Sequence, residues 1–355
     1  MQKENFSFSI FMIMIFVLST SFFVIMHSPG ISMAQAVSSS HPFVSYQYLK
    51  QWGSKGSAFG QFLTPNGIVV DSSGNVYVTD TGNSRIQKFD SNGNFITKWD
   101  FVSPDAGQIV RPEGLAVDSS GHVYIDDNYT SNIIKFDSTG KIIKKWGSKG
   151  SGDGQFVSPE GLAVDSSGHV YVSDNGNSRI QKFDSNGNFI TKWNFKDPTN
   201  GQFVSPEGLA VDSSGHVYVT NYNSNMVIKF DSNGNFITKW RANNPEDIAV
   251  DSIGNVYVTD YTGVLKFDSN GNLITKWGSS GSGNGQFIGS GAIAIDSSGH
   301  VYVADSGNNR IEVFAPVIHS MISNKIHSEN KTFPDNAPSN KGNKFFSQSG
   351  ISDQV

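Results

Sequence analysis

Residues 161–193 read GLAVDSSGHVYVSDNGNSRIQKFDSNGNFITKW, and this stretch decides the fold. Four short segments rich in apolar residues alternate with turns made of Asp, Asn, Ser and Gly. Turns of the Asp-x-x-Gly kind allow glycine to adopt a positive φ and suit short hairpins between antiparallel strands. The stretch therefore predicts four antiparallel strands, over residues 161–164, 169–173, 179–183 and 188–193.

The same unit recurs along the chain at a fixed spacing. Tryptophan closes each unit, and the first four gaps between tryptophans are 47 residues and the fifth is 37: Trp52, Trp99, Trp146, Trp193, Trp240 and Trp277. A period of this length indicates an array of one supersecondary unit. The first strand of each unit is continuously apolar, as expected for a strand covered on both faces. The fourth strand ends in Lys-Trp, and lysine on an outermost strand discourages edge-to-edge association.

Counting the strands predicts how the array closes. Six phenylalanines end third strands: Phe89, Phe136, Phe183, Phe230, Phe267 and Phe314. Only the first five are followed by a fourth strand, whereas Tyr46 to Trp52 resembles a fourth strand with no unit before it. We therefore predict an all-β, six-bladed β-propeller of four-stranded antiparallel blades over residues 46–317, in which the N-terminal strand completes the last blade and closes the ring.

The segments that flank the repeats have different compositions. Lys3, an apolar run over residues 6–26 and the sequence Ala34-Gln35-Ala36 predict a secretory signal peptide over residues 1–36. Because the run is long enough to span a bilayer, a retained membrane anchor is the alternative. Residues 37–45 are interpreted as a linker and residues 318–355, rich in Ser, Asn and Lys, as a disordered tail. Either interpretation of the N-terminus predicts a secreted or cell-surface protein.

Composition excludes several classes of protein. The chain has 355 residues and no cysteine, which excludes disulfides, thiolate zinc fingers and cysteine nucleophiles. The net charge of -5 argues against a nucleic-acid partner. We expect a monomer that contacts a membrane only if the N-terminal segment is retained. No cofactor is required by the sequence.

The third unit also resembles a known repeat. Gly154-Gln155-Phe156, the run from Pro159 to Asp174 and the run from Asn177 to Asp184 are closely similar to the NHL repeat, and the resemblance covers roughly residues 46–316. NHL propellers include protein- and RNA-binding modules, extracellular sensor domains and metal-dependent enzymes, so the resemblance implies the fold more firmly than the function. It also implies that ligands bind on the face that carries the loops into the first strand and between the second and third strands.

Those loops differ between blades, whereas the Asp-Ser-Ser-Gly turns expected on the opposite face are nearly uniform. Arginines mark blades one, three and six, and tyrosines mark blades two, four and five: Arg85, Arg179, Arg310, Tyr129, Tyr222 and Tyr261. Blade five has two shortened loops, which predict a notch lined by Arg241, Glu246 and Tyr261 with Tyr222 nearby. The alternative is a simple loop deletion of the kind that surfaces tolerate. The three arginines and three tyrosines that mark the blades, together with Arg241 and Glu246, are the candidate ligand contacts.

Two sets of residues could hold a metal. Glutamates open the first strands of blades two to five: Glu113, Glu160, Glu207 and Glu246. If they point inward, their oxygens could bind Ca²⁺ or perform acid–base work; otherwise they bond backbone locally or face solvent. Histidines follow the turns of four blades: His122, His169, His216 and His300. We interpret the histidines as turn residues, because Asn75 and Asn255 replace them in the other two blades.

The sequence favours a non-catalytic binding or scaffold propeller that recognises a peptide, a glycan or a surface protein through its variable loops. Near-identical units support this interpretation, because an active site normally needs a few unique residues with distinct roles. A metal-dependent lyase or lactonase with its site at the channel mouth is one alternative. A structural component of the cell surface is another.

Overall fold

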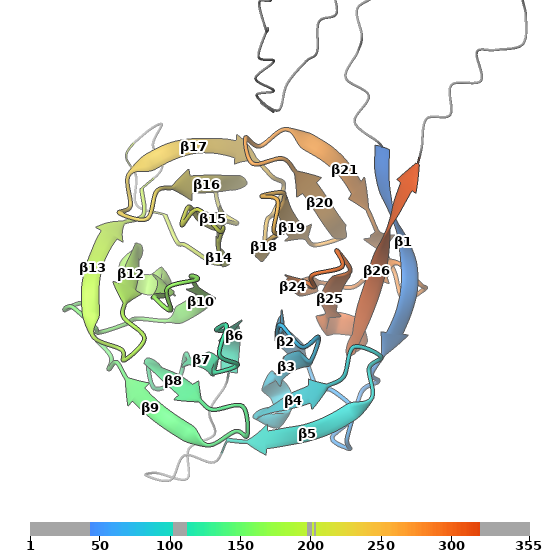
Figure 1. Ribbon diagram of the computed structural model, residues 1–355, viewed down its shortest axis with the longest axis horizontal. Coiled ribbons are helices and arrows are strands. Elements are labelled where there is room, and N and C mark those ends of the chain that lie inside the picture. Colours follow the sequence, from blue (N-terminus) through green and yellow to red (C-terminus); the bar gives the residue numbers. More distant parts are fainter. Residues whose placement is uncertain (1–42, 102–111, 197–200, 202–203, 320–355) are drawn as a thin grey trace, which may run out of the picture. The chain divides into compact units, whose positions relative to one another are not determined.

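Six four-stranded antiparallel sheets stand around a common axis, and the first strand of each lies innermost (Figure 1). This computed structural model describes residues 43–101, 112–196, 201 and 204–319. The predicted signal peptide or anchor, most of the linker and nearly all of the tail therefore lie outside the described residues. Within the described residues, no helix has the length and hydropathy needed to cross a membrane.

Each of the first five blades is continuous in sequence. Blade one contains β2 (Pro65–Val70), β3 (Val76–Asp80), β4 (Arg85–Phe89) and β5 (Phe95–Asp100). Blade two contains β6 (Pro112–Val117), β7 (Val123–Asp127), β8 (Asn132–Phe136) and β9 (Ile142–Trp146). Blade three contains β10 (Pro159–Val164), β11 (Val170–Asp174), β12 (Arg179–Phe183) and β13 (Phe189–Asn194). Blade four contains β14 (Leu209–Val211), β15 (Val217–Asn221), β16 (Met226–Phe230) and β17 (Phe236–Arg241). Blade five contains β18 (Ile248–Val250), β19 (Val256–Asp260), β20 (Gly263–Phe267) and β21 (Leu273–Trp277).

Blade six joins the two ends of the repeat array. It contains β24 (Ser290–Ile295), β25 (Val301–Asp305) and β26 (Arg310–His319), and its outermost strand is β1 (Phe43–Trp52). β1 pairs antiparallel with β26 from Phe43 opposite His319 to Trp52 opposite Ile311. The predicted closure by an N-terminal strand is therefore present, and both strands extend slightly beyond the expected limits of 46 and 317.

Short elements occupy the loops between these strands. β22 (Ser279–Ser280) and β23 (Gln286–Phe287) form a small parallel pair in the loop that enters blade six. Three 3-10 helices join second to third strands in blades one, three and six: η1 (Thr81–Asn83), η2 (Asn175–Asn177) and η3 (Ser306–Asn308). In blade five, Asp260 pairs directly with Gly263, which explains the shorter loop there.

The repeated turns explain why histidine and asparagine interchange. In blade three, the Asp165 carboxylate accepts the backbone amides of Ser167 and His169, and Gly168 closes the turn with a φ of +81°. The Nδ1 atom of His169 lies 2.8 Å from the other Asp165 oxygen. In blade one, the side-chain amide nitrogen of Asn75 donates to the Asp71 carboxylate in the same way, also at 2.8 Å. The histidines are therefore turn residues, as the sequence indicates.

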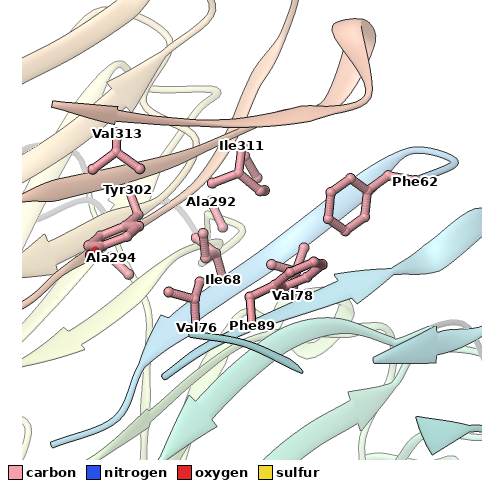
Figure 2. Packing of buried hydrophobic residues seen from close by; sticks show 11 residues of the cluster. Phe62, Ile68, Val76, Val78, Phe89, Ala292, Ala294, Tyr302, Ile311 and Val313 are labelled. Atoms are coloured by element: carbon pink, nitrogen blue, oxygen red, sulfur yellow. The ribbon is translucent and has the colours of Figure 1, made fainter. Parts of the chain in front are cut away.

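The hydrophobic core is divided into clusters, most of which lie between neighbouring blades. Figure 2 shows one of them, in which Ile68, Val76 and Phe89 of blade one pack against Tyr302 and Ile311 of blade six. Equivalent clusters at the other junctions bury a second-strand tyrosine of one blade against the inner strands of the next. Because each blade contributes to two clusters, a blade removed from the ring would expose apolar surface on both sides.

The fourth-strand tryptophans form a second contact between blades. Trp146 of blade two lies against Gly187 in the last turn of blade three, where an added Cβ would come within 2.7 Å of the ring. Blade six has no such turn, because its third strand, β26, and its fourth strand, β1, are not consecutive in the chain. Tyr46 takes its place: its ring stacks on Trp277 with 4.2 Å between centroids. Tyr46 therefore completes the last junction of the ring.

Candidate functional site

An acidic cavity opens at the end of the channel where the inner strands begin. Its volume is about 390 Å³, and its lining includes Asn66, Glu113, Glu160, Glu207, Tyr222, Glu246 and Asp247. We call this cavity the mouth and the opposite side, which carries the Asp-Ser-Ser-Gly turns, the turn face. The structure thus brings all four predicted glutamates to one cavity. No lysine or arginine lines it among the described residues.

Two of the four glutamates hold neighbouring loops. The side-chain amide of Asn128 donates to Glu113 at 3.1 Å, and that of Asn175 donates to Glu160 at 2.6 Å. Each asparagine follows the second strand of the same blade, so the contact fixes the loop that rises beside the mouth. We assign Glu113 and Glu160 to this role and do not count them as metal ligands.

The other two glutamates have raised pKa values. Burial, then the charges of Glu160 and Glu246, raises the pKa of Glu207 to about 8. Burial, then the charges of Asp247 and Asp260, raises the pKa of Glu246 to about 7. Carboxyl groups that titrate near neutral pH suit proton transfer as well as the binding of a cation.

Asp247 is a third acidic group of the mouth, and the sequence analysis did not single it out. It stands in blade five where the first four blades have glycine: Gly67, Gly114, Gly161 and Gly208. Its Oδ2 accepts the backbone amide of Ile293 in blade six at 2.9 Å. Burial raises its pKa to about 6. An acidic residue at a repeat position that otherwise holds glycine, or Ala292 in blade six, is the signal that could have identified it.

We expect Glu207→Gln to stabilise the protein at pH 8 and to change little at pH 4. The native pKa of about 8 lies above the ordinary value of 4.5, so the native state keeps a proton that the unfolded chain loses. The stability of the wild type therefore falls as the pH rises through this window, and glutamine avoids that loss. Because the side chain is partly exposed, we expect a gain of about 1–2 kcal/mol. Thermal unfolding at both pH values tests this. Asp100→Asn, an exposed carboxyl on β5, is the control, and a gain that is the same at both pH values would contradict the expectation.

The three candidate arginines lie inside the fold. Arg85, Arg179 and Arg310 are only 4%, 5% and 6% exposed. The Nε atom of Arg179 donates to Asp174 at 2.6 Å, and its other nitrogens donate to the carbonyl oxygens of Ser151, Gly152 and Gln155. Arg85 and Arg310 repeat this arrangement with Asp80 and Asp305. These arginines therefore fix the loops that enter their blades, and their burial leaves little of each guanidinium group accessible to a ligand.

The tyrosines and Arg241 are exposed, but they do not form one notch. Tyr129, Tyr222 and Tyr261 are 63%, 41% and 51% exposed. Tyr222 lines the mouth together with Glu246, whereas Arg241 and Tyr261 do not line it. Arg241 ends β17 at the outer edge of blade four, and Tyr261 lies near Gly289 in the loop that enters blade six. The residues proposed for the notch are thus divided between the mouth and the surrounding surface.

The calcium prediction now depends on Glu207 and Glu246, with Asp247 beside them. Among the described residues, no three His, Cys, Asp or Glu side chains are grouped closely enough to hold a metal ion. Calcium binding therefore remains a prediction. Asp174, which ends the second strand of blade three, has an architectural role: it is fully buried and accepts from Val157, Asn177, Arg179 and Gln181.

Comparison with known proteins agrees with the propeller fold. The NHL repeat model matches residues 62–89, 156–183, 203–230 and 291–314. Protein lin-41 of Caenorhabditis elegans is 49% identical over 47 residues, which are 13% of this chain and 4% of that protein. The chain therefore spans only a small part of this relative.

Solved structures share the fold at low sequence identity. A virginiamycin B lyase from Staphylococcus aureus superposes with a TM-score of 0.54 and 15% identity, covering 77% of this chain and 99% of the lyase. A gluconolactonase from Xanthomonas campestris superposes with a TM-score of 0.56 and 14% identity, covering 73% of this chain and 88% of the gluconolactonase. A protein of unknown function from Bacteroides thetaiotaomicron superposes with a TM-score of 0.59 and 16% identity, covering 77% of this chain and 76% of that protein. At such identities the likeness concerns the fold alone.

Proposed function

We propose that this chain, which belongs to the NHL-repeat β-propellers, is an extracytoplasmic binding module that takes a basic group of a peptide or protein partner into its mouth. The observation that carries the proposal is the acidic cavity on the propeller axis, with four glutamates and Asp247 in its lining and Tyr222 at its side. Aromatic rings and carboxylates together are what a lysine or arginine side chain contacts most favourably.

The path of the chain supports presentation of the mouth to a partner. β1 begins and β26 ends beyond the turn face, where Phe43 pairs with His319. The described unit therefore begins and ends on the side of blade six opposite the mouth, so neither of its two ends lies at the mouth.

The proposal is tested with short lysine-containing peptides and their acetylated counterparts in calorimetric titrations. We expect binding to strengthen as the pH rises from 6 to 9, because a cation prefers the ionised forms of Glu207 and Glu246, whose pKa values are about 8 and 7. The double variant Glu207→Gln/Glu246→Gln should weaken binding about tenfold or more. Asp100→Asn/Asp153→Asn removes the same charge from exposed positions away from the mouth and should leave the affinity nearly unchanged. Equal binding of acetylated peptides would contradict the proposal.

Acid–base catalysis is the second candidate, and the raised pKa values of Glu207 and Glu246 favour it. The names of the lyase and the lactonase that share the fold suggest compounds for a test, namely virginiamycin B and gluconolactone. Turnover of either compound that disappears in Glu207→Gln but survives in Asp100→Asn would establish an enzyme instead of a binding module.

A further inference from the structure

Among the described residues, a hydroxyl group of a second strand bridges neighbouring blades at four of the six junctions beside the mouth. It comes from the second strand of one blade and donates to the backbone carbonyl oxygen of a residue that opens the next blade. The donors share one repeat position, and their donor–acceptor distances are 3.4 Å for Thr79 to Glu113, 2.7 Å for Ser173 to Glu207, 2.9 Å for Thr220 to Glu246 and 2.9 Å for Thr259 to Gly291.

Blade two has Asp126 at this position. The residue is fully buried on β7, and its Oδ1 accepts the backbone amides of Glu113 and Gly114 at 3.2 and 3.0 Å. Its Oδ2 is buried and has no hydrogen-bond partner among the described residues. A buried polar atom without a partner is costly, so its surroundings require an explanation.

Oδ2 of Asp126 lies where the bridging hydroxyl lies at the next junction. A Cβ placed on Gly114 would be 2.5 Å from this atom and 2.4 Å from the carbonyl oxygen of Glu160. A Cβ placed on Gly161 would similarly be 2.9 Å from the Ser173 hydroxyl and 2.1 Å from the carbonyl oxygen of Glu207. At both sites a side-chain oxygen and the carbonyl oxygen that opens the next blade lie within 3 Å of one point, and an ionised Asp126 would put two acceptors there.

We propose that Asp126 is a neutral carboxylic acid whose Oδ2 proton is donated to the Glu160 carbonyl oxygen, so that a proton completes the junction between blades two and three. The charged groups that face it are Glu113 on β6 and Glu160 on β10, both acidic. Its cross-strand neighbour on β8 is the apolar Ile133. Burial, then the charge of Glu113, raises the pKa of Asp126 well above its ordinary range, in agreement with this geometry.

Asp126 is thus a positioning residue that holds the backbone of Glu113 and Glu160 on the two sides of one junction. Its ionisation would break the bridge and add a negative charge beside the mouth. Asp126 therefore adds its own pH dependence to the stability of the fold, beside that of Glu207. This inference stands apart from the proposed peptide binding, because the bridge requires no ligand.

The test compares the wild type with Asp126→Asn, in which the amide nitrogen donates to Glu160 while the amide oxygen still accepts from Gly114. The wild type keeps a proton that the unfolded chain loses above about pH 4, so its stability falls as the pH rises toward the native pKa. We therefore expect similar Tm values near pH 4 and a Tm several degrees higher for Asp126→Asn at pH 8. A difference that does not change with pH would overturn the proposal.

A direct measurement supplements the thermal scans. Carbon-13 NMR of the carboxyl carbons, with the Asp126 signal identified by its loss in the variant, should show a protonated acid at pH 7. Asp126→Thr, which restores the hydroxyl of blade one, identifies the signal equally well if the asparagine variant does not fold. An ionised Asp126 at pH 7 would refute the proposal even if peptide binding at the mouth is confirmed.

Discussion

Removal of residues 43–52 is expected to abolish the cooperative unfolding transition of the propeller. These residues form β1, and without them blade six keeps three strands and the ring loses its closing contacts. The loss should be comparable with the whole stability of a typical domain, about 5–15 kcal/mol. Thermal and urea unfolding, followed by near-ultraviolet circular dichroism, measure it.

The expected effect is large because β1 acts at two interfaces. Along its length it pairs with β26, and at its end Trp52 packs against the cluster between blades six and one. Tyr46 meets blade five, where its hydroxyl lies 2.8 Å from that of Tyr257 and accepts from Lys266 at 3.2 Å. At the junction between blades four and five, the equivalent Lys229 donates to a turn carbonyl, that of Ser269, at 3.3 Å. Tyr46 thus replaces a turn that the last blade lacks.

Two truncations and one pair of point variants serve as controls. Removal of residues 1–42 or 320–355, outside the described unit of Phe43–His319, should leave the transition almost unchanged. Tyr46→Ala should lose about 3 kcal/mol or more, whereas Leu49→Ala, on an exposed part of the same strand, should lose less than about 1 kcal/mol. A propeller without β1 that unfolds cooperatively at the wild-type temperature would show that the ring does not depend on this closure.

The repeat period predicted the fold almost completely, because strand alternation and turn chemistry are local and recur in every unit. The third blade illustrates this: its predicted strands agree with β10 to β13 within two residues at each end. The closing strand also followed from the sequence, by counting Phe and Trp positions. The role of Tyr46 did not, because it depends on the missing turn of the partner blade and on the approach of Trp277 in space.

The candidate site was predicted less well, because repeated position does not reveal the direction of a side chain. The sequence left open whether the glutamates point inward, and all four line the mouth. The arginines were assigned to the ligand face by their loop, although their guanidinium groups turn inward to buried aspartates. A comparison within the repeats contains the missing signal. Arginine occurs five residues after aspartate in blades one, three and six, whereas blade four has Asn221 followed by Met226, and in blade two Asp127 accepts from Tyr129 and Thr130 instead.

This covariation leads to the second large effect, the loss of stability expected for Arg179→Met. The substitution leaves Asp174 fully buried without the guanidinium that lies 2.6 Å from its Oδ2. Breaking a buried ion pair by removing one partner costs about 3–5 kcal/mol. The loop carbonyl oxygens of Ser151, Gly152 and Gln155 also lose their donors. We expect Tm to fall by roughly ten degrees.

Adding Asp174→Asn to Arg179→Met should recover part of this loss, because the double variant reproduces the Asn221–Met226 pair of blade four. There the amide oxygen of Asn221 accepts the backbone amide of Ser224 at 2.8 Å, and Met226 stands where blade three has Arg179. The unfolding free energies of the wild type, both single variants and the double variant form a cycle that isolates the coupling between the two side chains. Arg241→Met, on the exposed end of β17, is the matched control and should change stability by less than about 0.5 kcal/mol. If the double variant loses as much as the two single variants together, the charge of Asp174 is not what makes the arginine necessary, and the loop carbonyl oxygens alone account for its burial.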